Sequence, residues 1–111
     1  MKDKNRFSIL LEHLMSIADL KNSILARAVQ YDDSYISKWI SGKLLPTEKN
    51  HESTLQAISH CIIEALSEES ARQLLQEYQL QDIKDLETAI YDNLESEYMY
   101  VKELQNSTGT E

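Results

Sequence analysis

The chain has 111 residues, a length that suits one small domain or one domain with an appendage. Two Gly, one Pro and 41% hydrophobic residues favour an all-α fold, and the single Cys excludes an internal disulfide and a Cys-based zinc site. No apolar run approaches the ~20 residues that cross a membrane, and the first residues lack the apolar core of a signal peptide, so we expect a cytoplasmic protein.

The net charge of −8 is unevenly distributed along the chain. Residues 1–50 hold eight Lys or Arg against six Asp or Glu, a balance of +2, whereas residues 51–111 hold three against thirteen, a balance of −10. Phosphate contacts are local and are screened beyond a Debye length of ~8 Å, so the mildly basic half could contact nucleic acid while the acidic half points away. A balance of +2 gives one copy of the chain only weak affinity for nucleic acid, so we expect useful binding only when two copies act together.

The first predicted helix covers residues 6–18. His13 does not lie on the apolar stripe of this helix, so it is either a solvated side chain or a phosphate contact. Lys2, Lys4 and Arg6 form a short basic arm before it, which is either a disordered tail or a contact to the DNA backbone or minor groove. The stripe, at three- and four-residue steps, consists of Phe7, Leu10, Leu11, Leu14 and Ile17.

Two short helices joined by one tight turn are predicted next. The apolar positions of residues 22–30 share one face of a helix, and those of residues 33–41 share one face of another. Only about one tight turn fits between them, so the helices must cross. Gly42 ends the second helix, and Pro46 prevents its quick resumption. The apolar positions are Leu25, Ala26, Val29, Tyr31, Ile36 and Trp39.

Residues 36–46, ISKWISGKLLP, resemble the second-helix ending of the phage-repressor and Cro-like (Xre) helix-turn-helix family. The helix before them is similar to the family's first helix, where a small residue such as Ala26 lets the two helices approach. The resemblance covers roughly residues 6–66 and implies a small helical bundle that reads DNA with the second of these helices. Gln30 stands where the family prefers Gly, so we expect a left-handed backbone there.

The predicted DNA-binding residues follow from the chemistry of the two helices. Ser hydroxyls and Lys38 can bond to base edges, Tyr35 can pack on sugar or a thymine methyl, and Lys43 suits a phosphate. The first backbone N–H groups of the helix at Asn22 can hold an anion, and the resemblance implies a phosphate contact there, although simple capping is an alternative. Asp33 can accept from a cytosine amino group, or Asp32 or Asp33 can cap its helix. The set is Asn22, Ser23, Asp33, Ser34, Tyr35, Ser37, Lys38 and Lys43.

A fourth helix, with Leu55, Ile58, Ile62 and Leu66 on one face, is expected to close the core of a DNA-binding domain over residues 1–66. His51 has no partner at metal spacing in the sequence, and neither a metal site nor a cofactor is predicted.

Residues 67–106 are predicted to be a helical dimerisation segment, and residues 107–111 a disordered tail. Ser67 can cap a short amphipathic helix, and Asp82 can cap a longer one. The long helix carries an apolar stripe that water cannot satisfy, so it packs either on its own domain or on a second copy of the chain, and we expect the second copy. The predicted dimer contacts are Ile83, Leu86, Ile90, Leu94, Tyr98 and Val101.

No Gly-rich phosphate loop, paired metal ligands on a helix face or nucleophile with a placed base appears in the sequence, so no enzyme is expected. The sequence predicts a transcriptional regulator that binds a palindromic double-stranded DNA site as a homodimer. The alternative is a helix-turn-helix scaffold for protein–protein interaction without DNA binding, which the acidic balance and the apolar Ile40, Leu44 and Leu45 would permit. A further domain or a protein partner is open as well, because Cro-like domains often begin longer chains.

Overall fold

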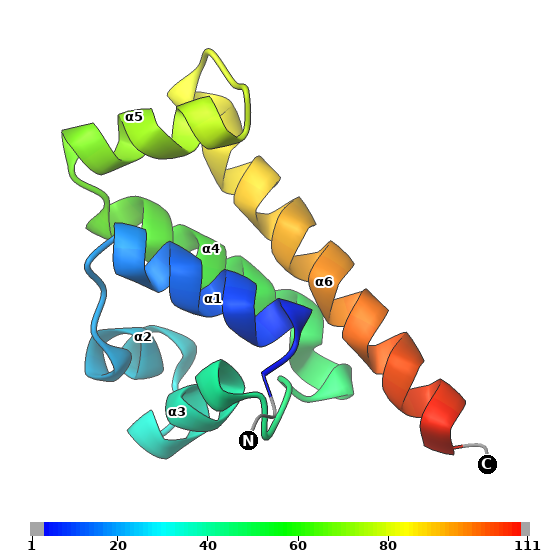
Figure 1. Cartoon of the computed structure of the whole chain (residues 1–111). Coiled ribbons are helices and arrows are strands. Elements are labelled where there is room, and N and C mark those ends of the chain that lie inside the picture. Colours follow the sequence, from blue (N-terminus) through cyan, green and yellow to red (C-terminus); the bar gives the residue numbers. More distant parts are fainter. Residues whose placement is uncertain (1–3, 110–111) are drawn as a thin grey trace.

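The computed structural model describes residues 4–109, which form α-helices and short 3₁₀ turns without a strand in that range (Figure 1). This architecture confirms the all-α prediction. Within the same range no helix combines the length and the apolar character needed to cross a bilayer. The helices are α1 (Arg6–Ile17), α2 (Asn22–Val29), α3 (Asp33–Ser41), α4 (His51–Ala65), α5 (Glu68–Glu77) and α6 (Leu86–Gly109), and the 3₁₀ turns Glu48–Asn50 and Ile83–Asp85 precede α4 and α6.

α1 begins with a reciprocal pair of hydrogen bonds. The Asn5 side chain accepts from the Ser8 backbone N–H, and the Ser8 hydroxyl oxygen accepts from the Asn5 backbone N–H, each at 2.8 Å. Such a capping box satisfies N–H groups that the first turn of a helix leaves unpaired. Ser8 and Met15 are buried, while Leu10 and Ile17 of the predicted stripe are only partly buried. The buried face of α1 is rotated from the predicted one because α1 packs against both α3 and α6.

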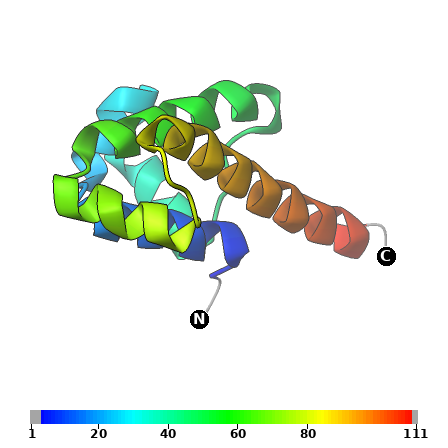
Figure 2. The same ribbon diagram turned by 90° about the horizontal axis from the view of Figure 1, so that it is seen from above.

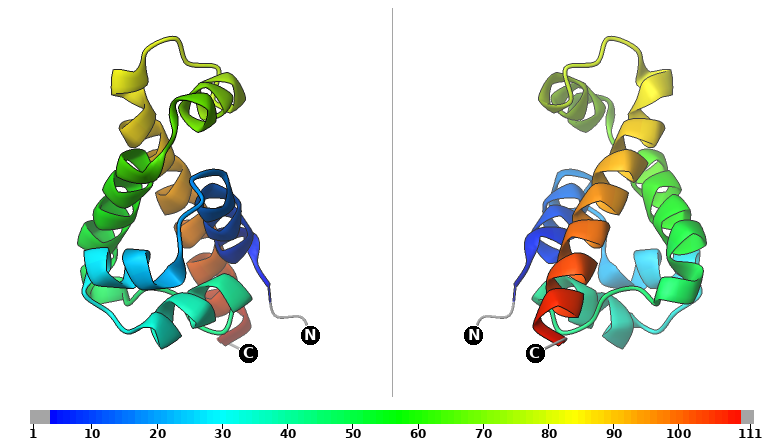
Figure 3. Two further views of the ribbon diagram at one scale, coloured as in Figure 1. Left: turned by 90° about the vertical axis from the view of Figure 1, so that its left-hand side faces the viewer. Right: turned by 90° about the vertical axis from the view of Figure 1, so that its right-hand side faces the viewer.

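α5 lies across one end of the molecule, and the chain turns back from it into α6 (Figures 1 and 3). The predicted Ser67 cap is present, since its hydroxyl accepts from the Ser70 N–H at 3.0 Å. The Asp82 carboxylate accepts from the Lys84 N–H at 3.0 Å and so caps the 3₁₀ turn before α6, not the long helix itself. α6 then packs along α1 and α4, and its C-terminal turns project beyond the other helices (Figure 2).

The apolar stripe of α6 is buried by its own chain, which corrects the prediction that it contacts a second copy. α1 and α4 do not close the core between them, and α6 fills the space along both (Figure 3). Of the six predicted dimer contacts, only Ile83, in the turn before α6, is exposed, at 49%. The period of the stripe identified the buried face, but it carries no information about which surface covers that face. The buried residues are Leu86, Ile90, Leu94, Tyr98 and Val101.

The predicted segments 1–66 and 67–106 share one hydrophobic core, in which Phe7 of α1 and Leu94 of α6 belong to the same cluster. The ring of Phe7 meets that of Tyr98 edge-on, with 6.0 Å between centroids. The helical backbone of α6 continues to Gly109, into the segment predicted to be a disordered tail, and residues 110–111 lie outside the described range. The C-terminal segment is therefore part of the domain and not an appendage to it.

Candidate nucleic-acid interface

A three-residue turn, Gln30 to Asp32, joins α2 to α3. Gln30 has φ 64° and ψ 42°, so the predicted left-handed backbone is confirmed. The Tyr31 N–H then reaches back to the Ala26 carbonyl at 2.9 Å and closes the end of α2. A non-Gly residue pays a modest conformational cost in this region, of about 1–2 kcal/mol. These three residues change the direction of the chain, so that α3 crosses and packs on α2 as predicted.

The inner faces of α2 and α3 meet over small and aromatic side chains. Ala26, Ile36 and Trp39 are buried, and Trp39 is only 1% exposed. Tyr31 lies between two rings: its centroid is 5.3 Å from that of Trp39 and 5.1 Å from that of Tyr35. The prediction that Trp39 belongs to the core is therefore confirmed. Tyr31 links the buried Trp39 ring to the exposed Tyr35 ring and packs against both.

The outer face of α3 carries polar side chains that the core does not use. Ser34, Tyr35, Ser37 and Lys38 are all exposed, Tyr35 at 43%. This orientation matches the predicted one, because Ile36 and Trp39 occupy the opposite face of the same helix. Their contact with DNA stays a prediction.

The start of α2 borders this outer face. Lys21 occupies the N-cap position, and no side chain caps the helix, so neither Asn22 nor Ser23 has the capping role that was the alternative to anion binding. The Asn22 amide donates instead to the Ser37 hydroxyl at 3.3 Å, which joins the start of α2 to the middle of α3. Lys21 is exposed at the same end of α2 and is not among the residues that the sequence pattern singles out. The position of Lys21 directly before the predicted helix was the sequence signal that could have identified it as a phosphate-contact candidate.

The first residues of α3 are acidic and exposed. Asp32 occupies the N-cap position with an extended backbone, φ −74° and ψ 155°, and Asp33 lies in the first turn. No side-chain capping hydrogen bond forms at this helix, so the two carboxylates act on α3 only through its dipole. A base contact by Asp33 stays a prediction.

Gly42 ends α3 with a positive φ of 90°, the conformation that the absence of a Cβ permits. The Lys38 carbonyl accepts from the backbone N–H groups of Gly42, Lys43 and Leu44, at 3.1, 2.9 and 3.2 Å. This fold of the chain places the exposed Lys43 directly past the end of α3. The following loop is anchored further on, where the buried Tyr98 hydroxyl donates to the Pro46 carbonyl at 2.9 Å.

The predicted basic arm is largely engaged within the chain. Lys4 pairs with Glu12 and donates to the Ile40 carbonyl at 2.9 Å. Arg6 makes a two-pronged contact to Glu97, at 2.6 and 3.0 Å, and stacks over the Tyr100 ring. A contact of Lys4 or Arg6 with the DNA backbone or minor groove stays a prediction, and Lys2 lies outside the described residues.

The structure also places His13 and the three apolar residues near the end of α3. His13 is exposed, as expected of a solvated side chain, and lies 3.1 Å from the Glu77 carboxylate, while its contact with a phosphate stays a prediction. Of the three apolar residues that would permit a protein–protein contact, Ile40 and Leu45 pack against the core, and only Leu44 is exposed, at 41%. The apolar surface that would suit a protein partner near α3 is correspondingly small.

The acidic half of the chain lies mainly away from α3. α6 is on the other side of α1 and α4 from α2 and α3, and α5 is at the opposite end of the molecule from α3 (Figure 1). Residues 20–45 hold four Lys or Arg against two Asp. The fold thus keeps the basic side chains of residues 20–45 away from the acidic side chains of α5 and most of α6. No protein-family model, no curated protein and no solved structure matches this chain.

Proposed function

We propose that the chain is a transcriptional regulator that binds double-stranded DNA sequence-specifically through the outer face of α3. The observation that carries the proposal is the outward row Ser34, Tyr35, Ser37 and Lys38 on a helix whose other face is buried. None of these four side chains contributes to the hydrophobic core. The resemblance of residues 36–46 to the Cro-like family supports the same function.

The dimensions and the chemistry of α3 suit a major groove. An α-helix with its side chains is ~10–12 Å in diameter, and the major groove is ~12 Å wide, so α3 can enter it. Ser hydroxyls can donate or accept at base edges, and Lys38 can donate to guanine O6 or N7. Lys21 and Asn22 at one end and Lys43 at the other would contact the phosphates that flank the groove.

The proposal includes two copies on a palindromic site, since one copy offers a basic balance of only +2 over residues 1–50. Two reading helices about 34 Å apart would enter successive major grooves on one side of the duplex. The α6 stripe is buried within each chain, so the copies would meet through another surface or be brought together by the DNA itself.

Selection of bound sites from a random double-stranded pool, followed by gel-shift titration, tests this function. We expect an enriched palindrome, and Ser37→Ala with Lys38→Ala should weaken its binding by ~1–3 kcal/mol while the melting temperature changes little. Lys84→Ala is the charge-matched control, because Lys84 is exposed in the acidic half of the chain. A pool without enrichment, or equal weakening by the control, would refute the proposal.

A scaffold for protein–protein interaction is the second candidate, and the net charge of −8 with the exposed Leu44 favours it. It predicts a folded chain that enriches no DNA sequence and whose measured affinity for any DNA stays in the non-specific range. The same selection therefore distinguishes the two functions.

A further inference from the structure

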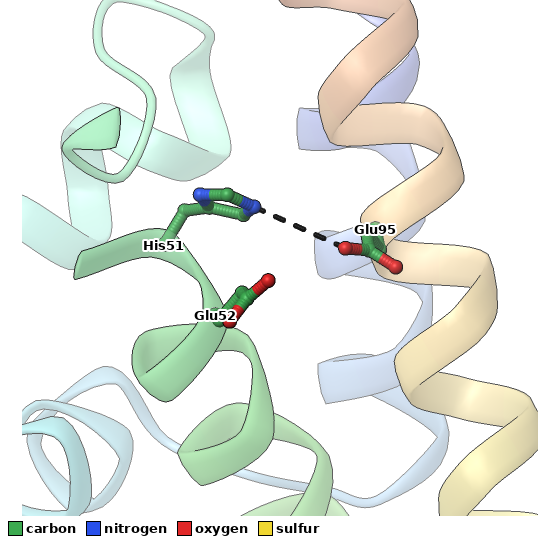
Figure 4. A group of neighbouring side chains, drawn as sticks. All are labelled: His51, Glu52 and Glu95. Carbon is green, nitrogen blue, oxygen red and sulfur yellow. Dashed lines mark ion pairs between the residues drawn. The ribbon is translucent and has the colours of Figure 1, made fainter. Parts of the chain in front are cut away.

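Three potential metal-ligand side chains converge between the start of α4 and the middle of α6 (Figure 4). His51 and Glu52 are the first two residues of α4, and Glu95 comes from α6. Each offers one ligand atom, and the three atoms all lie within 4.8 Å of one another. The Nε2 atom of His51 is 3.9 Å from Oε2 of Glu95. The cluster is thus assembled by the packing of α6 on α4, a contact between elements distant in sequence.

The orientation of the His51 ring is fixed by two neighbours. Its Nδ1 lies 3.0 Å from the Glu48 carbonyl, and its plane stacks on Tyr98 at 4.7 Å between centroids and 10° between planes. A carbonyl oxygen can only accept, so Nδ1 carries a proton and donates it. In the neutral ring, Nε2 then holds a lone pair that faces the carboxylates. Metal-binding histidines commonly use one nitrogen for such an orienting bond and the other for the metal.

The carboxylates give this region a negative potential. The His51 side chain is 18% exposed and that of Glu95 is 36% exposed, so water and ions can reach the cluster from one side. A lone pair and two carboxylates that face one another repel unless a proton or a metal ion lies between them.

We propose that His51, Glu52 and Glu95 bind a divalent transition-metal ion. Ligand atoms at ~2.0–2.2 Å from a tetrahedral ion are about 3.4 Å apart, so the present separations of up to 4.8 Å must shorten by up to about 1.4 Å. The exposed Glu52 can rotate toward the ion, and the 3.9 Å between His51 Nε2 and Glu95 Oε2 needs to close by about 0.5 Å. Three protein ligands leave the fourth position for water. The imidazole selects Zn²⁺ or Co²⁺ over Mg²⁺ and Ca²⁺, which prefer oxygen ligands alone.

This site is independent of DNA binding by α3, but it lies against the loop that follows α3. His51 stacks on Tyr98, and the Tyr98 hydroxyl donates to the Pro46 carbonyl. A bound ion would cross-link α4 to α6 directly beside this contact. Because only the folded chain brings the three ligands together, the ion should also raise the melting temperature.

Titration of the full chain with Zn²⁺ by calorimetry, and with Co²⁺ by visible absorption, tests the site. We expect one ion per chain and a Co²⁺ spectrum of low coordination number. His51→Gln, Glu52→Gln and Glu95→Gln should each lower the affinity for Zn²⁺ at least tenfold. His60→Gln is the matched control, since His60 also lies 3.4 Å from two carboxylates, those of Glu64 and Glu87, but each of its nitrogens faces a different one.

Circular dichroism of each variant separates loss of the site from loss of the fold. Glu52 is exposed at the surface, so Glu52→Gln keeps the test valid even if His51→Gln unfolds the chain. Absence of saturable binding of one Zn²⁺ at up to ~1 mM would overturn the proposal and leave His51 and Glu95 as an ion pair. Binding that is lost in His60→Gln and retained in His51→Gln would overturn it as well.

Discussion

Tyr98→Phe tests whether α6 belongs to the core of its own chain. Tyr98 is 1% exposed, and its hydroxyl donates to the Pro46 carbonyl at 2.9 Å across 52 positions of sequence. The substitution keeps the ring between Phe7 and His51 and removes only the hydroxyl, so no large cavity forms. It leaves the buried carbonyl without this donor, at a cost of about 1–3 kcal/mol.

For a domain of this size, a loss of about 2 kcal/mol lowers the melting temperature by ~8–15 °C. Thermal unfolding followed by circular dichroism measures the change, at protein concentrations that differ a hundredfold. The midpoint should be independent of concentration, because the hydrogen bond is internal to one chain.

Tyr100→Phe is the matched control two residues away. Tyr100 is 43% exposed, and the variant keeps the ring beneath Arg6, so its stability should change by less than about 0.5 kcal/mol. Equal effects of the two substitutions would refute the placement of α6. So would a midpoint for Tyr98→Phe that rises steeply with protein concentration, because the ring would then lie between two copies.

Further outcomes follow from the same structure. Trp39→Ala should cost ~3–5 kcal/mol in chemical unfolding, since the ring is almost completely buried, and a stable variant would mean that α3 is rotated. Leu94→Ala should cost ~2–5 kcal/mol in the same assay, equally at all protein concentrations, and an effect below 1 kcal/mol would contradict its core position. Lys43→Ala should weaken binding to every DNA sequence alike and flatten the salt dependence by about one unit, whereas a changed sequence preference would argue against a phosphate contact. Burial and the charge of Glu48 raise the pKa of Tyr98, so stability should be fully present below pH ~10 and fall as pH rises further, less steeply in Tyr98→Phe.

The local chemistry of the α2–α3 unit was readable from the sequence because its determinants are close together. The left-handed backbone of Gln30 was expected because the family that this stretch resembles prefers Gly there, and Gly42 ends α3 through its own positive φ. The alternation of buried Ile36 and Trp39 with exposed Ser37 and Lys38 follows from the helical period alone.

The long-range contacts were not readable in the same way. The period of Leu86, Ile90 and Leu94 indicated a buried face, but a second copy and the α1–α4 surface would both satisfy it. His51 has no partner at metal spacing in the sequence because Glu95 reaches it from another helix. Such pairs depend on the path of the whole chain, which no local pattern specifies.

The packing of α6 on α1 has a consequence for the rate at which the chain folds. Arg6 and Glu97 are 91 positions apart, and the part of the core face of α1 that α3 does not cover stays open until α6 arrives. Contacts of such separation slow folding relative to bundles of sequential neighbours, because the closure of a long loop precedes the gain from burial. At a synthesis rate of about 5–20 residues per second, α1 waits about 5–20 s for α6. During that interval the apolar faces of α1 and α4 are open to chaperones, and also to neighbouring chains.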